Sequence, residues 1–146
     1  MVGAPGSGKS TFTSTKMKDY VRVNNDTYKN KEKCGKVCHE NLEQGKSVVI
    51  DNTNHTKDVR KHYIEIAKEM GVPIRCFYMT TDKPTCMHNN LMRKANVNRE
   101  HMSKAVPVIA IHTFFKNYAE PTLAEGFESV SEIQFVTDSF QNELDR

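Results

Sequence analysis

The feature that most constrains this chain is an octapeptide near its start, GAPGSGKS at residues 3–10, which fits the phosphate-binding pattern G-x-x-x-x-G-K-[ST]. The glycines of such a loop let the backbone bend closely around an oxyanion and point successive N–H groups inward. We expect a helix to begin at about Gly8, so that its positive dipole end also faces the phosphates. The pattern predicts a site for ATP or GTP, and the alternative is a Gly/Ser-rich linker before a helix.

Two side chains of the loop are expected to act directly on the nucleotide. Lys9 would reach the β- and γ-phosphates, and the Ser10 hydroxyl would ligate Mg²⁺. The expected ATP-binding residues of this segment are Gly3, Ala4, Pro5, Gly6, Ser7, Gly8, Lys9, Ser10 and Thr11.

Length and composition limit the remaining classes of protein. The chain has 146 residues, enough for one domain with a real core, and its net charge of +3 permits nucleic-acid binding without arguing for it. No apolar run approaches about 18 residues, so we expect no membrane-spanning helix and no membrane partner. Only two residues precede the loop, which leaves no room for a signal peptide.

The cysteines predict a reducing, intracellular setting. Cys34, Cys38, Cys76 and Cys86 follow no disulfide-rich pattern. A zinc cluster built on Cys34, Cys38 and His39 is disfavoured, because the three lie in the middle of a predicted helix and lack a second ligand pair.

Helices and strands alternate along the rest of the chain. Strand patterns cover 20–23, 47–50, 72–79 and 133–136, and helical patterns cover 9–19, 27–45, 56–70, 82–94 and 105–118, with an irregular stretch at 95–103. Thr27 is a possible N-cap of the second helix, and Gly45 its stop. This alternation predicts an α/β fold, with a parallel sheet covered by helices on both faces.

The start of the chain adds a further expectation. A phosphate-binding loop normally follows a buried strand, yet only Met1 and Val2 precede Gly3. The first strand is therefore expected to be largely truncated, and the chain to be a fragment of a longer protein. A shortened central strand would weaken a parallel sheet.

Two carboxylates are expected beside the loop, because ligands of such sheets bind beyond the carboxyl ends of the strands. Asp26 follows the second strand and is the candidate general base, which would take a proton from an attacking hydroxyl group. Asp51 follows the third strand and would hold Mg²⁺ directly or through water. An N-cap or turn role remains the alternative for Asp26, and a turn at the end of a strand for Asp51.

A lid over the nucleotide is expected at about residues 88–104. Arg93 lies at the end of the helix in this segment and is the candidate for neutralising charge in the transition state. The alternative is a solvated basic helix end, which the helix dipole favours. A phosphate-attracting surface near the acceptor could be formed by Lys29, Lys31, Lys33, Lys36, Lys57, Arg60 and Lys61, although a solvated helical face is an equal alternative.

Together these motifs resemble the kinase domain of the eukaryotic polynucleotide kinase 3′-phosphatases. The matching segments are VGAPGSGKSTF at 2–12, VNNDT at 23–27, VVIDNTN at 48–54, GVPIRCF at 71–77, HNN at 88–90 and EPTLAEGF at 120–127. The resemblance implies a P-loop kinase fold and phosphoryl transfer from ATP to the 5′-hydroxyl of DNA, with Mg²⁺. It makes Asp26 the base, sets Lys9, Ser10 and Arg93 around the ATP phosphates, and brings Asp51 into the cleft.

Asn52 and Thr53 follow Asp51 and would line the same cleft, with turn chemistry as the alternative. The expected DNA-binding residues are Asn25, Asp51, Asn52, Thr53 and Arg60.

Three positions depart from the family pattern. Asn25, Leu91 and His62 stand where arginines are expected, with Arg60 as a possible substitute for the last. The losses bear on DNA affinity and rate more than on ATP binding.

The resemblance also implies a biological setting. Residues 1–146 would form a single P-loop polynucleotide kinase domain that acts on DNA 5′-ends, either single-stranded or at strand breaks, in the nucleus during DNA repair. The domain would belong to a longer chain with a phosphatase domain, while no 3′-phosphatase activity is expected of these residues. The alternatives are a P-loop kinase for RNA ends or a small metabolite, and a degenerate, non-catalytic module that binds nucleotide or DNA ends.

Overall fold

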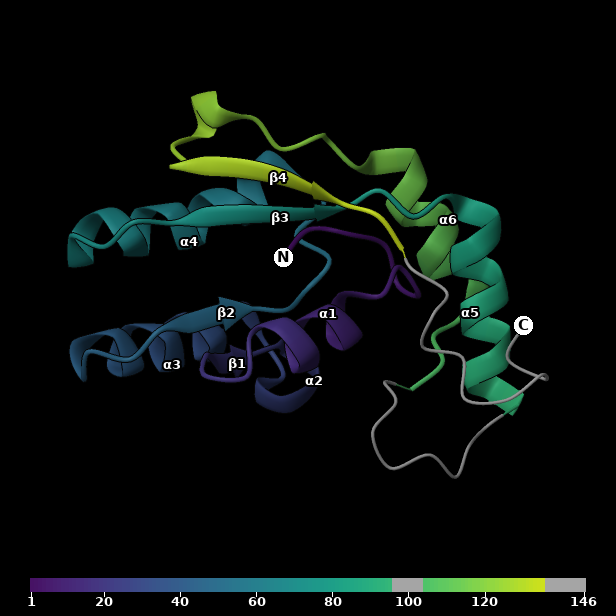
Figure 1. Cartoon of the computed structure of the whole chain (residues 1–146), viewed down its shortest axis with the longest axis horizontal. Coiled ribbons are helices and arrows are strands. Elements are labelled where there is room, and N and C mark those ends of the chain that lie inside the picture. The colour runs from purple at the N-terminus through teal and green to yellow at the C-terminus, as the bar shows by residue number, and fades with distance from the viewer. Residues whose placement is uncertain (96–103, 136–146) are drawn as a thin grey trace.

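The computed structural model describes residues 1–95 and 104–135 (Figure 1). Its elements are, in chain order, α1 (Lys9–Lys16), β1 (Val21–Val23), α2 (Asn25–Tyr28), α3 (Lys31–Glu43), β2 (Val48–Ile50), α4 (Lys57–Met70), β3 (Arg75–Met79), α5 (Lys83–Ala95), α6 (Val108–Asn117), the 3₁₀ turn η1 (Leu123–Glu125) and β4 (Ser129–Ile133).

The strands form two parallel pairs, β1 with β2 and β3 with β4. Residues 1–3 lie between β2 and β3 and join the pairs, as Figure 1 shows at the label N. The Met1 amino group donates to the Ile50 carbonyl at 2.9 Å, and Val2 forms a parallel bridge with Tyr78. The spatial order is therefore β1, β2, residues 1–3, β3, β4. This arrangement confirms the predicted α/β fold with parallel strands.

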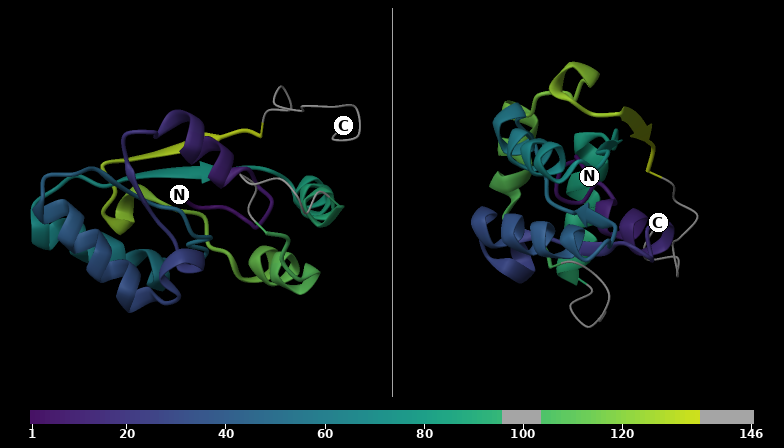
Figure 2. Two further views of the ribbon diagram at one scale, coloured as in Figure 1. Left: turned by 90° about the horizontal axis from the view of Figure 1, so that it is seen from below. Right: turned by 90° about the vertical axis from the view of Figure 1, so that its left-hand side faces the viewer.

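Helices cover both faces of this sheet (Figure 2). On one face, Phe12 and Met17 from the region of α1 pack on Met1, Val49 and Met79. On the other face α3 and α4 lie against the strands and against each other. Helices α5 and α6 lie beyond the carboxyl ends of the strands, beside the phosphate-binding loop (Figure 1).

An apolar cavity of about 380 Å³ lies along β2 and β3. Its lining includes Val48 and Ile74 near the starts of β2 and β3, together with Tyr63 and Phe127. The cavity also reaches Met1, Val2, Ile50 and Asn54, while none of residues 3–10 lines it.

The predicted helix at 27–45 is wrong in one respect, since it consists of the two helices α2 and α3. Asn24 and Asn30 are extended, and each side chain accepts a hydrogen bond from a backbone N–H three residues later, at 2.8 and 2.9 Å. Two asparagine N-caps thus begin two helices. Thr27, which was expected to be the N-cap, instead donates its backbone N–H to Asn24.

The last strand also differs from its expected position at 133–136. Strand β4 spans Ser129–Ile133, and Ser129 pairs with Arg75 while Ile133 pairs with Met79. Ser129, Ser131 and Glu132 make β4 mostly polar and weaken the apolar signal, so pairing with β3 decides where the strand begins. Residue 136 and the irregular stretch at 96–103 lie outside the described residues. Within the described ranges, no helix is both long and apolar enough to cross a membrane.

A buried ion pair ties the segment around η1 to α4. Arg60 is 2% exposed, and its guanidinium donates to both carboxylate oxygens of Glu125, at 2.8 and 3.1 Å, and to the Asn54 carbonyl at 3.0 Å. Burial alone would raise the pKa of Glu125, but hydrogen bonds from Arg60 and the Thr122 N–H outweigh burial and hold this pKa below its usual value.

We expect Arg60→Ala to lower the free energy of unfolding by about 3–5 kcal/mol, because the Glu125 carboxylate and the Asn54 carbonyl would remain buried without a cation. Urea unfolding followed by circular dichroism measures the loss. Lys61→Ala is the matched control: Lys61 is exposed and pairs with Glu65 on the same helix, so its loss should be below about 0.5 kcal/mol. Equal losses in the two variants would contradict the role of the buried pair.

Candidate functional site

The phosphate-binding loop has a backbone that only glycine permits at two positions. Gly6 has a φ of 82°, and a Cβ at this position would lie 2.5 Å from the Cys86 carbonyl oxygen of α5. Gly8 has a φ of 98° and begins α1 without a side-chain cap. The first N–H groups of α1 are therefore left for an anion, as the sequence pattern predicts.

Two side chains from outside the loop hold its carbonyl groups in place. Thr81 donates its hydroxyl to the Ser7 carbonyl at 2.7 Å, and Asn89 donates its amide to the Gly6 carbonyl at 2.8 Å. No pattern in the sequence predicts these contacts of Thr81 and Asn89. Asn89 belongs to the HNN motif at residues 88–90. That motif was the signal in the sequence that could have pointed to Asn89.

Lys9 lies inside the loop and is buried. Its ammonium donates to the carbonyls of Gly3 and Ala4, both at 2.9 Å. Burial lowers the pKa of Lys9 to about 8; the Arg93 guanidinium acts in the same direction, while the carboxylates of Asp51 and Asp26 act in the opposite direction. Asp26, Asp51 and Arg93 thus all lie within electrostatic range of the Lys9 ammonium.

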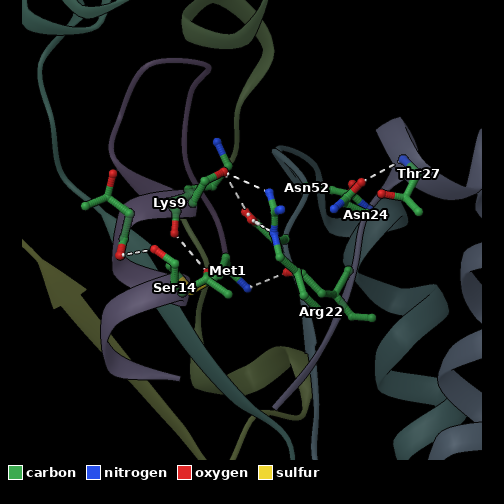
Figure 3. Close-up of polar contacts among 12 residues, drawn as sticks. Met1, Lys9, Ser14, Arg22, Asn24, Thr27 and Asn52 are labelled. Carbon is green, nitrogen blue, oxygen red and sulfur yellow. Dashed lines mark hydrogen bonds and ion pairs between the residues drawn. The ribbon is translucent and has the colours of Figure 1, made fainter. Parts of the chain in front are cut away.

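Asp51 follows β2 and is buried next to α1. Its Oδ2 accepts hydrogen bonds from the Ser10 hydroxyl at 3.2 Å and from Nε of Arg22 at 2.7 Å. Nη2 of Arg22 also donates to the Ser10 hydroxyl at 3.0 Å. The Ser10 hydroxyl, the Arg22 guanidinium and Oδ2 of Asp51 thus form a triangle of hydrogen bonds. Figure 3 shows Arg22 reaching from β1 toward the helix that carries Lys9 and Ser14.

The pair formed by Ser10 and Asp51 fits a divalent cation. Oδ1 of Asp51 is buried and has no hydrogen-bond partner among the described residues, so one carboxylate oxygen is available beside a hydroxyl group. No group of three His, Cys, Asp or Glu side chains in the described ranges could hold a metal ion. Mg²⁺ does not need such a group, because it binds through one or two carboxylates together with substrate phosphates.

Asp26 lies in the first turn of α2 at the end of β1, and it is exposed. The capping role in this turn belongs to Asn24, whose side chain accepts from the Thr27 N–H. Among the described residues the Asp26 carboxylate has no hydrogen bond or ion pair. The capping alternative for Asp26 is therefore not supported. Its carboxylate is available to contact a substrate hydroxyl group.

Arg93 lies in the last turn of α5 and is half-buried. Burial lowers its pKa, while Cys86 and Asp51 act in the opposite direction. Arg93 is thus not a fully solvated helix end: it is half-buried and lies within electrostatic range of Lys9 and Asp51. The rest of the predicted lid, residues 96–103, lies outside the described part of the chain.

Some of the residues expected to bind DNA lie beside Asp26 and Asp51, and others lie elsewhere. The Asn25 N–H donates to Oδ1 of Asn52 at 2.8 Å, which joins the ends of β1 and β2 next to Asp26. The Thr53 carbonyl accepts from the Gly3 N–H at 3.1 Å and so supports the loop. Asn25, Asn52 and Thr53 therefore lie at the same edge of the sheet as the two carboxylates.

Arg60 requires a correction. Its buried guanidinium is bound to Glu125 and Asn54, so it does not face an acceptor and cannot substitute for a missing arginine. His62 packs at the contact of α4 with α3, where its ring would meet a Cβ at Gly35. Leu91 is 62% exposed on α5. Arg22, which the sequence analysis did not single out, is the additional cation of the site.

The comparisons with known proteins agree with this geometry. The family described as AAA domain matches residues 29–121, a range that begins after the phosphate-binding loop, so the loop is identified by its own pattern and geometry. The bifunctional polynucleotide phosphatase/kinase of Schizosaccharomyces pombe is 42% identical over 137 residues, which cover 92% of this chain and 33% of that protein.

Two more distant relatives extend the comparison. A putative bifunctional polynucleotide phosphatase/kinase of Acanthamoeba polyphaga mimivirus is 36% identical over 144 residues, 94% of this chain and 33% of that protein. A protein of Arabidopsis thaliana named transcription factor bHLH140 is 27% identical over 141 residues, 89% of this chain and 15% of that protein. The chain spans about a third of the length of the two phosphatase/kinases. The chain therefore belongs to the AAA domain family, and its resemblance to the kinase domain of the polynucleotide phosphatase/kinases is confirmed.

Proposed function

We propose that this chain is a polynucleotide kinase that transfers the γ-phosphoryl group of ATP to the 5′-hydroxyl of DNA. The observation that carries the proposal is the convergence of Asp26, Asp51 and Arg93 within electrostatic range of Lys9. A base, a metal-binding carboxylate and two cations around one phosphate-binding loop are the components that phosphoryl transfer requires. The names of the two phosphatase/kinase relatives support a polynucleotide as the acceptor.

Binding of ATP follows from the loop. The N–H groups at the start of α1 receive the phosphates, and Lys9 exchanges its two carbonyl partners for phosphate oxygens. An ammonium that is buried and bound only to neutral carbonyls gains a counter-charge in this exchange. The buried loop thus favours a polyphosphate over water.

The transfer step follows from the placement of the charged groups. The 5′-hydroxyl oxygen attacks the γ-phosphorus, and Asp26 accepts the hydroxyl proton as the bond to the leaving oxygen of ADP breaks. Lys9 and Arg93 stabilise the negative charge on the transferred group and on ADP. Mg²⁺ held by Ser10 and Asp51 would neutralise charge on the β- and γ-phosphates.

The acceptor and its setting complete the proposal. Asn25, Asn52 and Thr53 would line the acceptor side next to Asp26, and exposed lysines such as Lys29 would attract the DNA backbone. Relatives about three times longer support a longer chain with a phosphatase domain. As the setting of this activity we propose DNA-end repair in the nucleus, with 5′-ends at strand breaks or in single strands as the substrates.

We expect Asp26→Asn to lower the rate of phosphorylation of a 5′-hydroxyl oligonucleotide by about 10²- to 10⁴-fold, because the amide cannot take the proton. Labelled ATP measures this rate, and fluorescence titration with an ATP analogue should give an unchanged Kd. Asp19→Asn is the matched control, since Asp19 is an exposed aspartate in the loop after α1, and its rate should stay at the wild-type value.

Retained activity in Asp26→Asn would rule out Asp26 as the base. Parallel assays with DNA, RNA and nucleoside acceptors identify the substrate, and faster transfer to RNA or to a nucleoside would refute the DNA assignment. A wild-type protein that binds ATP but transfers nothing would identify the chain as a binding module.

Arg93→Ala should reduce kcat by about 10³-fold or more, because an arginine on the transferred phosphoryl group acts mainly in the transition state. The Kd for ATP should rise far less. Lys94→Ala provides the control from the next residue, which is exposed, and should leave kcat within about twofold of the wild type. Equal losses in the two variants would mean that general positive charge, and not Arg93, is required.

The affinity for ATP should depend on pH through Lys9. ATP binding raises the pKa of Lys9 above its free value of about 8, so affinity is highest below pH 8 and falls by up to tenfold per pH unit above it. Isothermal titration calorimetry in buffers from pH 6.5 to 9.5 measures the trend. Lys9→Ala should bind ATP weakly and lose this dependence, and a normal Kd in that variant would contradict the role of the loop.

A further inference from the structure

Arg22 places a permanent positive charge between the two side chains that would ligate Mg²⁺. Its guanidinium lies 2.7 Å from Oδ2 of Asp51 and 3.0 Å from the Ser10 hydroxyl, and the hydroxyl lies 3.2 Å from the same Oδ2 (Figure 3). Each edge of this triangle is a hydrogen bond. A single guanidinium thus binds both of the ligating groups.

The contact joins a solvated cation to a buried anion. The side chain of Arg22 is 43% exposed, whereas that of Asp51 is 1% exposed. Side chains alternate along β1, so Val23 is buried in the core while Arg22 lies on the other face, next to Ser10 of α1. A carboxylate as buried as Asp51 needs a counter-charge in the folded protein. Arg22 supplies this charge without being part of the core.

Arg22 and a divalent cation would compete for the Ser10 hydroxyl oxygen. The guanidinium donates to the hydroxyl oxygen that would ligate the metal, and its charge opposes a second cation at this short range. Oδ1 of Asp51 is buried without a hydrogen-bond partner among the described residues. This oxygen lies outside the triangle and could ligate a cation. A metal ion bound to this oxygen and to the Ser10 hydroxyl would take the place of the Arg22 hydrogen bond to that hydroxyl.

We propose that Arg22 is a built-in counter-cation, which occupies the place of the metal in the nucleotide-free protein and swings into solvent when a divalent cation binds to Ser10 and Asp51. Arg22 thereby sets the metal affinity of the site and keeps Asp51 paired while the site is empty. The inference rests on the proposed function only in taking Ser10 and Asp51 as the metal ligands.

If Arg22 instead orients Asp51 for the metal, the predicted change in metal affinity has the opposite sign. If Arg22 stays on Oδ2 and orients Asp51 while the metal binds Oδ1, Arg22 strengthens metal binding. Removing it would then weaken metal binding instead of strengthening it. The direction of the change therefore decides between competition and orientation.

The test compares Arg22→Gln with Arg75→Gln. Arg75 is an exposed arginine at the start of β3, away from the loop, and donates to the Tyr20 hydroxyl, so its replacement removes the same charge elsewhere. Free Mn²⁺ is measured by electron paramagnetic resonance with each protein saturated with a non-hydrolysable ATP analogue. We expect Arg22→Gln to bind Mn²⁺ about tenfold more tightly or better, the effect of one adjacent charge on a carboxylate, and Arg75→Gln to match the wild type. Weaker or unchanged Mn²⁺ binding in Arg22→Gln overturns the proposal.

Thermal unfolding supplies a second readout that needs neither nucleotide nor DNA. In EDTA, Arg22→Gln should melt below the wild type, because Asp51 is left unpaired, and added Mg²⁺ should raise its Tm more than that of the wild type. Arg22→Lys, which keeps the charge but loses the two-point contact, should fall between the two and serves if Arg22→Gln does not fold. Identical Mg²⁺ responses of the wild type and both variants would contradict the proposal.

Asp51→Asn separates this inference from the proposed function. It should weaken Mn²⁺ binding in the wild type and remove the gain from Arg22→Gln, because both effects act through one carboxylate. Unchanged Mn²⁺ binding in Asp51→Asn would refute the metal site itself. Weakened binding in Asp51→Asn without any gain in Arg22→Gln would refute the role of Arg22 alone. Transfer of phosphate to DNA enters neither result.

Discussion

The hydrogen bonds of residues 1–3 to both neighbouring strands hold the two halves of the sheet together. Among the described strands β2 and β3 do not pair with each other; Met1 donates to Ile50 of β2, and Val2 pairs with β3. The phosphate-binding loop follows directly, and the Gly3 N–H donates to Thr53 after β2. These few backbone contacts bring the loop to the same edge as the ends of β1 and β2, where Asp26 and Asp51 lie.

The site at this edge is prepared for a polyanion by its own positive charge. Lys9 is buried and Arg93 is half-buried, and burial lowers the pKa of each. Arg22 brings a third cation to the buried Asp51 carboxylate. Cations that have lost part of their hydration gain the most free energy from a phosphate ligand. Their close placement is unfavourable in the folded protein, and a bound nucleotide would offset that cost. The same arrangement explains why a metal and Arg22 would compete.

Local signals predicted much of the fold. The sequence pattern predicts a helix over residues 56–70, and α4 has Thr56 as its N-cap and Gly71 in the left-handed conformation after its last residue. Such signals act within one turn, so short-range chemistry decides them. The sequence did not predict the division between α2 and α3. An asparagine can lie in a loop or in a helix, and only the hydrogen bonds that the side chains of Asn24 and Asn30 accept identify them as N-caps.

The sequence by itself determined the phosphate-binding loop, the order of strands and helices, and the polar residues that follow each strand, because these depend on residue types at fixed spacing. Only the tertiary structure decided how the charged side chains pair. Arg60 turned inward to Glu125, 65 positions away in the chain, while Arg22 turned toward Asp51, 29 positions away. An arginine in a sequence carries the same charge in either role, and burial with the partner it meets across the fold decides which role it has.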